Sequence, residues 1–244
     1  FDGRRRRRLT PMEAGQIAGR AGRFRNNGTF GTTGDCMPMD EDMVGHIENH
    51  IFEPMKYAEW RNTKLDFRSA EALLDSLAAS TPHKRLRRVA PATDEDAFER
   101  MIAIPSVADT LKTPRDVKRL WEVCQIPDFR NLTIDTHVKL LSDIYAQILD
   151  NGGEIPHEFL QRRIARLDHT DGGVDILSTR LAQIRTWTYC ANVSGWLEDS
   201  KYWINQTRAV EDRLSDALHE LLTARFVDRR TGALLRGMGQ NFNM

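Results

Sequence analysis

The residues with the clearest capacity for chemistry lie between positions 9 and 23, in the sequence LTPMEAGQIAGRAGR. Arg20 and Arg23 are three positions apart, so on a helix both guanidinium groups project from one face. Planar groups of fixed positive charge at this spacing suit the oxygens of a phosphate group. The segment therefore predicts a helix that presents two arginines to a phosphate.

Local signals place these arginines on a short helix. Thr10 can cap a helix, Pro11 suits the first helical position, and Glu13 is spaced to close a capping box with Thr10. A helix is therefore expected to begin at Pro11. After it, the Asn-Gly pair at residues 27–28 is typical of a turn, and residues 29–33 are expected to form a short strand.

Three glycines interrupt this helix, and each costs roughly 1 kcal/mol relative to alanine at an interior helical position. A gain from close approach would offset that cost. We expect the small residues to let Gln16, Arg20 and Arg23 lie against a ligand or another domain. The glycines are Gly15, Gly19 and Gly22.

Residues 16–23, QIAGRAGR, match the pattern Q-x-x-G-R-x-G-R, which resembles motif VI of superfamily 2 DExH-type helicases. The segment is most similar to the mitochondrial RNA-degradosome (suppressor-of-Var) helicase family and its bacterial homologues. In that family, motif VI lies on the second RecA-like domain and faces the ATP bound to the first. The alternative is a chance Gly-Arg helix in a nucleic-acid-binding protein.

The resemblance implies a role for each motif residue. Arg23 would be the arginine finger on the γ-phosphate, Arg20 its companion, and Gln16 would help to orient the attacking water. Gly19 and Gly22 would lie at the nucleotide. An arginine finger is typically worth about 10³ to 10⁵ in turnover. The cofactors implied are ATP and magnesium, both held by the full-length parent.

Other parts of an ATP site are missing from the sequence. It contains no G-x-x-x-x-G-K-[ST] segment to hold phosphates and no DExH carboxylates to hold magnesium. The family places both on the first RecA-like domain, upstream. The chain also begins with Phe1, and we expect it to be a piece of a longer protein that does not hydrolyse ATP alone.

Length and composition limit the class of protein to which the chain can belong. With 244 residues, 40% of them hydrophobic, the chain can bury one or two cores. Its formal net charge is zero, so any nucleic-acid site must be a local patch. No apolar run reaches the roughly 18 residues of a membrane span. Cys36, Cys124 and Cys190 lie far apart, which favours a reducing compartment such as the bacterial cytoplasm over a disulfide framework or zinc finger.

The predicted fold is mainly α. Residues 1–34 are expected to be a short α/β remnant of a second RecA-like domain, residues 35–68 a connector, and residues 69–244 a multi-helix C-terminal domain. Capping residues and apolar stripes predict helices over residues 41–50, 70–80, 94–101, 116–124, 134–149, 157–167, 174–197 and 202–228.

The resemblance extends loosely over this helical part. Relatives carry a mostly helical C-terminal domain that closes over the RecA-like pair and lines a channel for the single strand. Aromatic stacking by Trp187 would fit such a channel. The alternatives are solvated basic helix faces and a core tryptophan. The basic candidates are Lys84, Arg85, Arg87 and Arg88, where a helix face is expected, and Arg162, Arg163 and Arg166.

The partners implied by the resemblance are single-stranded nucleic acid, RNA before DNA, the upstream RecA-like domains of the same chain, and an exoribonuclease. No membrane partner is expected. The opposing interpretation of the whole chain is a non-catalytic helical docking module for a nuclease or another protein. A nucleic-acid channel predicts salt-dependent binding, whereas a docking module predicts an exposed apolar patch.

Two smaller features have alternative explanations. The arginine run at residues 4–8 is either a solvated loop or a phosphate contact. His46 and His50 are four positions apart and could share a metal. However, the pattern is not that of a zincin and no third ligand is evident, so a partly exposed helix is the expected role.

Overall fold

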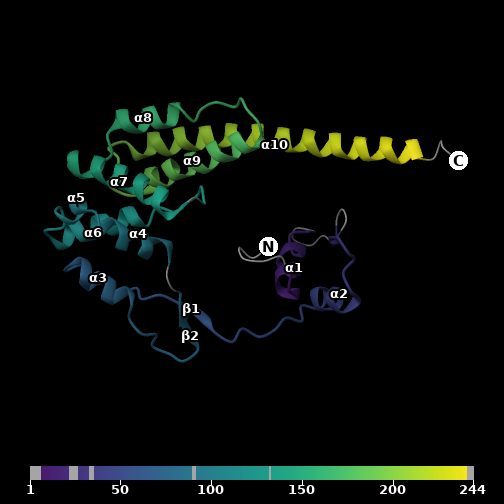
Figure 1. Ribbon diagram of the computed structural model, residues 1–244, viewed down its shortest axis with the longest axis horizontal. Helices are drawn as coiled ribbons and strands as arrows, with labels where there is room; N and C mark the ends of the chain where they lie inside the picture. The colour runs from purple at the N-terminus through teal and green to yellow at the C-terminus, as the bar shows by residue number, and fades with distance from the viewer. Residues whose placement is uncertain (1–6, 22–26, 33–35, 90–91, 132, 241–244) are drawn as a thin grey trace. The chain divides into compact units, whose positions relative to one another are not determined.

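The structure is a computed structural model that describes residues 7–21, 27–32, 36–89, 92–131 and 133–240, with side chains described as far as Arg225 (Figure 1). It is mainly helical, as the sequence predicts. The chain divides into two compact units. The first comprises residues 1–59 and 83–87, and the second comprises residues 60–82 and 88–244.

Two short helices form the first unit, α1 (Pro11–Ala18) and α2 (Glu41–Glu48). Both begin as predicted: Thr10 caps α1 with a complete capping box, and the Asp40 carboxylate accepts a 2.7 Å hydrogen bond from the Met43 N–H at the start of α2. The predicted strand is absent from residues 27–32, where the backbone is irregular. A strand needs a neighbour to pair its backbone groups, and no described strand pairs with this segment.

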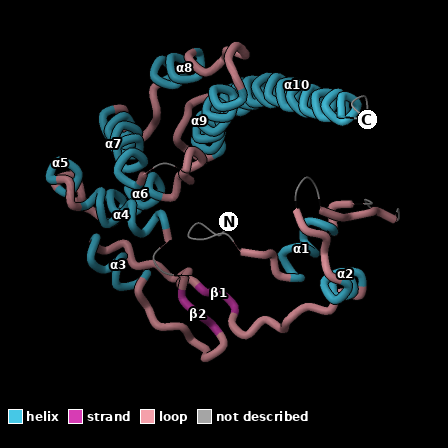
Figure 2. Tube along the Cα trace, turned by 45° about the vertical axis from the view of Figure 1, so that its right-hand side comes forward, coloured by secondary structure: helices cyan, strands magenta, loops and turns pink. Residues whose placement is uncertain are grey.

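A small parallel sheet pairs β1 (Ala58–Trp60) with β2 (Leu86–Arg88), drawn side by side in Figure 2. The Ala58 N–H donates to the Arg85 carbonyl at 2.9 Å, and the Val89 N–H donates to the Trp60 carbonyl at 3.4 Å. The predicted helix face at this basic cluster is therefore wrong. The partner strand lies far upstream in the sequence, where a local pattern does not reveal it.

The second unit is built from helices, and Figure 1 shows α9 and α10 running side by side. Helix α4 packs against both α6 and α7. The helices are α3 (Ala70–Leu77), α4 (Thr93–Ile102), α5 (Pro105–Ala108), α6 (Pro114–Cys124), α7 (Ile134–Asp150), α8 (His157–Ala165), α9 (Val174–Asn192) and α10 (Ser200–Gln240).

Most helix starts in this unit match the sequence signals. Ser69 caps α3, and Thr113 forms a capping box with Asp116 at the start of α6. Two ends differ from expectation. Helix α9 stops at Asn192 because Val193 is extended and Gly195 has a φ of +80°, a conformation that favours glycine. Helix α10 runs on to Gln240, beyond the predicted end at residue 228.

The predicted apolar stripes form one core. Leu120, Leu141 and Leu214 are fully buried, and Trp187, Trp196 and Trp203 are also buried. Cys124 on α6 belongs to this core, and burial raises the pKa of its thiol. No helix in the described part of the chain combines the length and apolar character that a membrane crossing requires.

One histidine is buried in the same core. His137 on α7 is only 3% exposed, and its Nε2 lies 3.1 Å from the carbonyl oxygen of Ile126. Burial lowers the pKa of His137, against the opposing effects of Asp128 and the Ile126 carbonyl. The ring is therefore neutral in the folded protein at pH 7. An unfolded histidine titrates near pH 6.5, so the unfolded chain binds more protons below that pH.

The free energy of unfolding of the second unit is therefore expected to fall as pH decreases. Between about pH 7.5 and 5.5, His137 should remove up to about 1.4 kcal/mol. Urea denaturation followed by tryptophan fluorescence measures this, because all five tryptophans lie in the second unit. The variant His137→Gln is neutral throughout and retains an N–H donor, so it should flatten the pH dependence. The same slope in both proteins would contradict the prediction.

Candidate functional site

Hydrogen bonds to Glu13 hold the first turn of α1, the helix that leads into the motif. The Thr10 N–H and hydroxyl donate to Oε2 of Glu13 at 2.8 and 3.0 Å, and Nη1 of Arg7 donates to the same oxygen at 2.7 Å. The hydrogen bond from Arg7, followed by those from Thr10, lowers the pKa of Glu13 to about 2. The carboxylate is thus charged at neutral pH and stabilises the start of α1. One arginine of the run at residues 4–8 has an internal partner.

The first glycine of the motif region is explained by packing. A Cβ atom on Gly15 would lie 2.8 Å from Cζ of Phe52, closer than a side chain tolerates. The gain that offsets the helix cost of Gly15 is therefore close contact with Phe52 within the first unit. Gly19 follows the last residue of α1 as its C-cap, and its N–H donates to the Gly15 carbonyl at 2.8 Å. Arg20 therefore lies in the turn after α1, and the prediction that a helix carries it is wrong.

The motif residues that the structure describes are accessible. Gln16, Gly19 and Arg20 are all exposed. Gln16 and Gly19 also line an open groove of about 580 Å³ beside α1, whose walls include Phe30 and Phe52. Arg23 and Gly22 lie outside the described residues. The geometry leaves one side of the motif helix free to meet a ligand or another domain.

The basic residues at positions 84–88 separate into two groups. Arg88 is held internally: its Nη2 donates to Oε2 of Glu95 at 2.7 Å, and its Nε donates to the Leu77 carbonyl at 2.9 Å. Lys84, Arg85 and Arg87 are exposed. Three of the four candidates are therefore accessible to a phosphate backbone, whereas Arg88 supports the fold.

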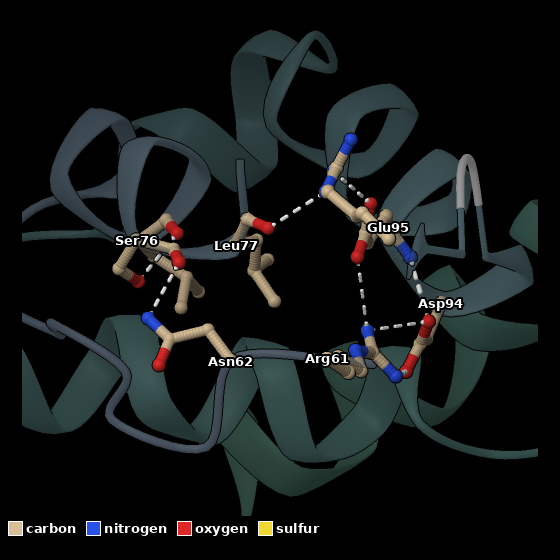
Figure 3. Close-up of polar contacts among 8 residues, drawn as sticks. Arg61, Asn62, Ser76, Leu77, Asp94 and Glu95 are labelled. Carbon is tan, nitrogen blue, oxygen red and sulfur yellow. Dashed lines mark hydrogen bonds and ion pairs between the residues drawn. The ribbon is translucent and has the colours of Figure 1, made fainter. Parts of the chain in front are cut away.

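Arg88 belongs to a wider ionic network at the start of α4, shown in Figure 3. Arg61 donates to both oxygens of Asp94 at 2.7 and 2.8 Å, and its Nη2 lies 3.5 Å from Oε1 of Glu95. The Arg61 guanidinium also lies over the Trp121 ring, 5.3 Å from its centroid. Arginines on both sides neutralise the carboxylates, so this cluster stabilises the fold.

The three arginines of the α8 region differ in the contacts that they make. Nε of Arg162 donates to the Glu158 carbonyl at 3.3 Å, and Arg162 is exposed. The Arg163 guanidinium lies over the rings of Phe159 and Trp187, at 5.0 and 6.0 Å from their centroids. Arg166 is exposed and lines a pocket together with Arg163.

The residues around that pocket overturn one expectation, about Trp187, and add one residue to the candidate site, Arg130. Trp187 is only 4% exposed and is covered by Phe159 and Arg163, so it presents no free face on which a base can stack. Arg130, which the sequence analysis did not single out, joins Arg163 and Arg166 in the pocket lining. Arg130 lies in a turn before α7, and no periodic pattern links it to α8.

The histidine pair on and after α2 has no metal-site geometry. Nδ1 of His46 lies 2.6 Å from the Asp42 carbonyl oxygen one turn earlier, and His50 follows the helix with a φ of +54°. Within the described ranges, no group of three or more histidine, cysteine, aspartate or glutamate residues is arranged to hold a metal ion.

Comparison with known proteins gives no match: no family model, no curated protein and no solved structure matches this chain. What the chain does is therefore inferred from its own residues and from the geometry around them.

Proposed function

We propose that this chain is the C-terminal part of an ATP-dependent helicase that acts on single-stranded nucleic acid, with RNA favoured. The observation that carries the proposal is the QIAGRAGR segment at residues 16–23. Its first three residues form the end of the capped helix α1, Gln16 and Arg20 are exposed, and Gln16 lines an open groove. Residues 1–34 are then the end of the second RecA-like domain.

In this proposal the upstream RecA-like domain binds ATP and magnesium. Arg23 and Arg20 approach the γ-phosphate as the two RecA-like domains close, and Gln16 helps to orient the attacking water. Arginine at this position stabilises the charge that develops on the transferred phosphoryl group. The capped start of α1 supports the role of Gln16, because a rigid helix holds the orientation of the side chains that it carries.

The helical unit steers the strand. Lys84, Arg85 and Arg87 offer exposed positive charge next to this unit in the sequence, and Arg162 and Arg166 offer it on α8 and just after it. The chain has no net charge, so such local patches must supply the attraction to phosphate. Binding through phosphate contacts is independent of sequence and weakens as salt rises.

The proposal is tested by ATP hydrolysis in a longer version of the protein that includes the upstream RecA-like domain. We expect single-stranded RNA to stimulate its hydrolysis of ATP, and we expect the 244-residue chain alone to hydrolyse none. A coupled phosphate-release assay with and without RNA measures both. A longer chain that shows no nucleic-acid-stimulated hydrolysis would overturn the proposal in favour of a docking module.

A further inference from the structure

A pocket of about 260 Å³ lies among α7, α8 and α9 in the second unit. Arg163 and Arg166 line it from α8 and its C-terminal end, Thr186 and Trp187 line it from α9, and Arg130 enters from the turn before α7. None of the described residues that line the pocket is acidic. The pocket therefore concentrates the positive charge of three arginines over a partly apolar floor.

One polar atom in this lining is buried without a partner. Nε of Arg130 is inaccessible to solvent and donates to no acceptor among the described residues. Buried donors are almost always paired in folded proteins. Arg130 therefore carries a donor that the described part of the chain leaves unpaired, in a pocket lined by two further arginines. Thr186, also in the lining, is only 3% exposed.

The orientation of Arg163 supports an anionic ligand. Its guanidinium face rests over Phe159 and Trp187, and a guanidinium carries its N–H donors at its edge. Its pairing with Asp143 is loose, with Nη2 of Arg163 and Oδ2 of Asp143 3.4 Å apart and both side chains at least a third exposed. Arg163 therefore retains donors for a further acceptor.

We propose that Arg130, Arg163 and Arg166 bind a backbone phosphate of single-stranded nucleic acid in this pocket. This inference rests on the proposed function and gives the helical unit a specific contact. Arg162 and Arg166 are exposed, so positive charge continues from the pocket along the α8 region, which suits a polyanion better than an isolated phosphate. Because Trp187 is covered, the pocket holds the backbone rather than stacking a base, and it does not read sequence.

The test uses the full 244-residue chain and a short fluorescein-labelled oligouridylate. Fluorescence anisotropy gives the dissociation constant and its salt dependence for the wild type and for Arg130→Gln and Arg166→Gln. Each variant should weaken binding about tenfold at low salt, the loss of one charged hydrogen-bonding group. Each should also reduce the slope of log K against log salt by about 0.7, the value for one phosphate contact on a single strand.

The matched control is Arg162→Gln. It removes the same charge from the same helix but does not alter the pocket lining. It should weaken binding much less than Arg166→Gln does, because it lowers only the overall positive charge near the pocket. A further variant, Thr186→Val, keeps the shape of the side chain and removes only its hydroxyl. It should weaken binding while leaving thermal stability unchanged or raised.

A direct readout is the side-chain Nε–H resonance of Arg130, assigned by its absence from the Arg130→Gln spectrum. The oligouridylate should shift this resonance. A resonance that stays in place, with equal binding by the Arg130, Arg166 and Arg162 variants, would overturn the pocket while leaving the ATP-hydrolysis test of the helicase proposal intact. A shift with pyrophosphate but not with the oligonucleotide would also overturn it, in favour of a site for free phosphate groups.

Discussion

Replacing Arg23 with alanine in the longer, ATP-hydrolysing protein is expected to lower turnover by at least about a hundredfold. An arginine finger meets charge that develops only in the transition state, and its removal typically costs about 10³ to 10⁵ in turnover. The loss should therefore fall on kcat, with little change in KM for ATP. Arg20→Ala should show a loss of the same kind, because the proposed function makes Arg20 the companion of Arg23.

The measurement is steady-state ATP hydrolysis at saturating single-stranded RNA, with circular dichroism to establish that each variant folds. Arg8→Ala is the matched control, because Arg8 is an exposed arginine of the same unit that lies outside the motif. Saturating RNA removes any effect of Arg8 on strand binding. Equal turnover of the Arg23→Ala and Arg8→Ala proteins would refute the arginine-finger role and leave the docking surface of the helical unit to be studied.

Replacing Glu95 with alanine is expected to lower the free energy of unfolding of the second unit by about 3 kcal/mol. The Glu95 side chain is only 5% exposed and faces two arginines, with Arg88 Nη2 2.7 Å from Oε2. Removing one partner of a buried ion pair typically costs about 3 to 5 kcal/mol because it leaves the other charge uncompensated. Arg61 and Arg88 are each about a third exposed, so water moderates the loss toward the lower end.

Asp96→Ala provides the comparison on the same helix. Asp96 also lies in the first turn of α4, so both variants lose one carboxylate near the positive end of the helix dipole. Asp96 pairs instead with Arg100, and both of their side chains are at least a third exposed. Such a pair contributes about 0.3 to 0.5 kcal/mol. Urea denaturation followed by tryptophan fluorescence measures the loss of unfolding free energy in each variant. Equal losses in the two variants would show that the buried network does not stabilise the fold.

Local interactions made much of the fold predictable. The capping pairs Thr10 with Glu13 and Thr113 with Asp116 join residues three positions apart, so the sequence alone reveals them. Helix existence, most helix starts and the core stripe of α6 follow from the same short-range rules. The end of α9 was less predictable, since the φ of Gly195 decides it.

The candidate site was predictable only in part. The sequence identified the motif at residues 16–23 because all of its residues lie close together along the chain. It did not predict that Gly15 packs on Phe52 or that Arg130 shares a pocket with Arg163 and Arg166. These contacts join side chains that lie more than thirty positions apart.

The sequence by itself thus determined the helices, their caps and the apolar faces, since each depends on neighbours within one or two helical turns. Tertiary structure decided which charges are available. It turned residues 86–88 of the basic cluster into a strand, paired Arg88 with Glu95 and left Nε of Arg130 without an acceptor among the described residues. The physical reason is that an arginine serves the fold or a ligand according to which acceptors the folded chain brings within about 3 Å.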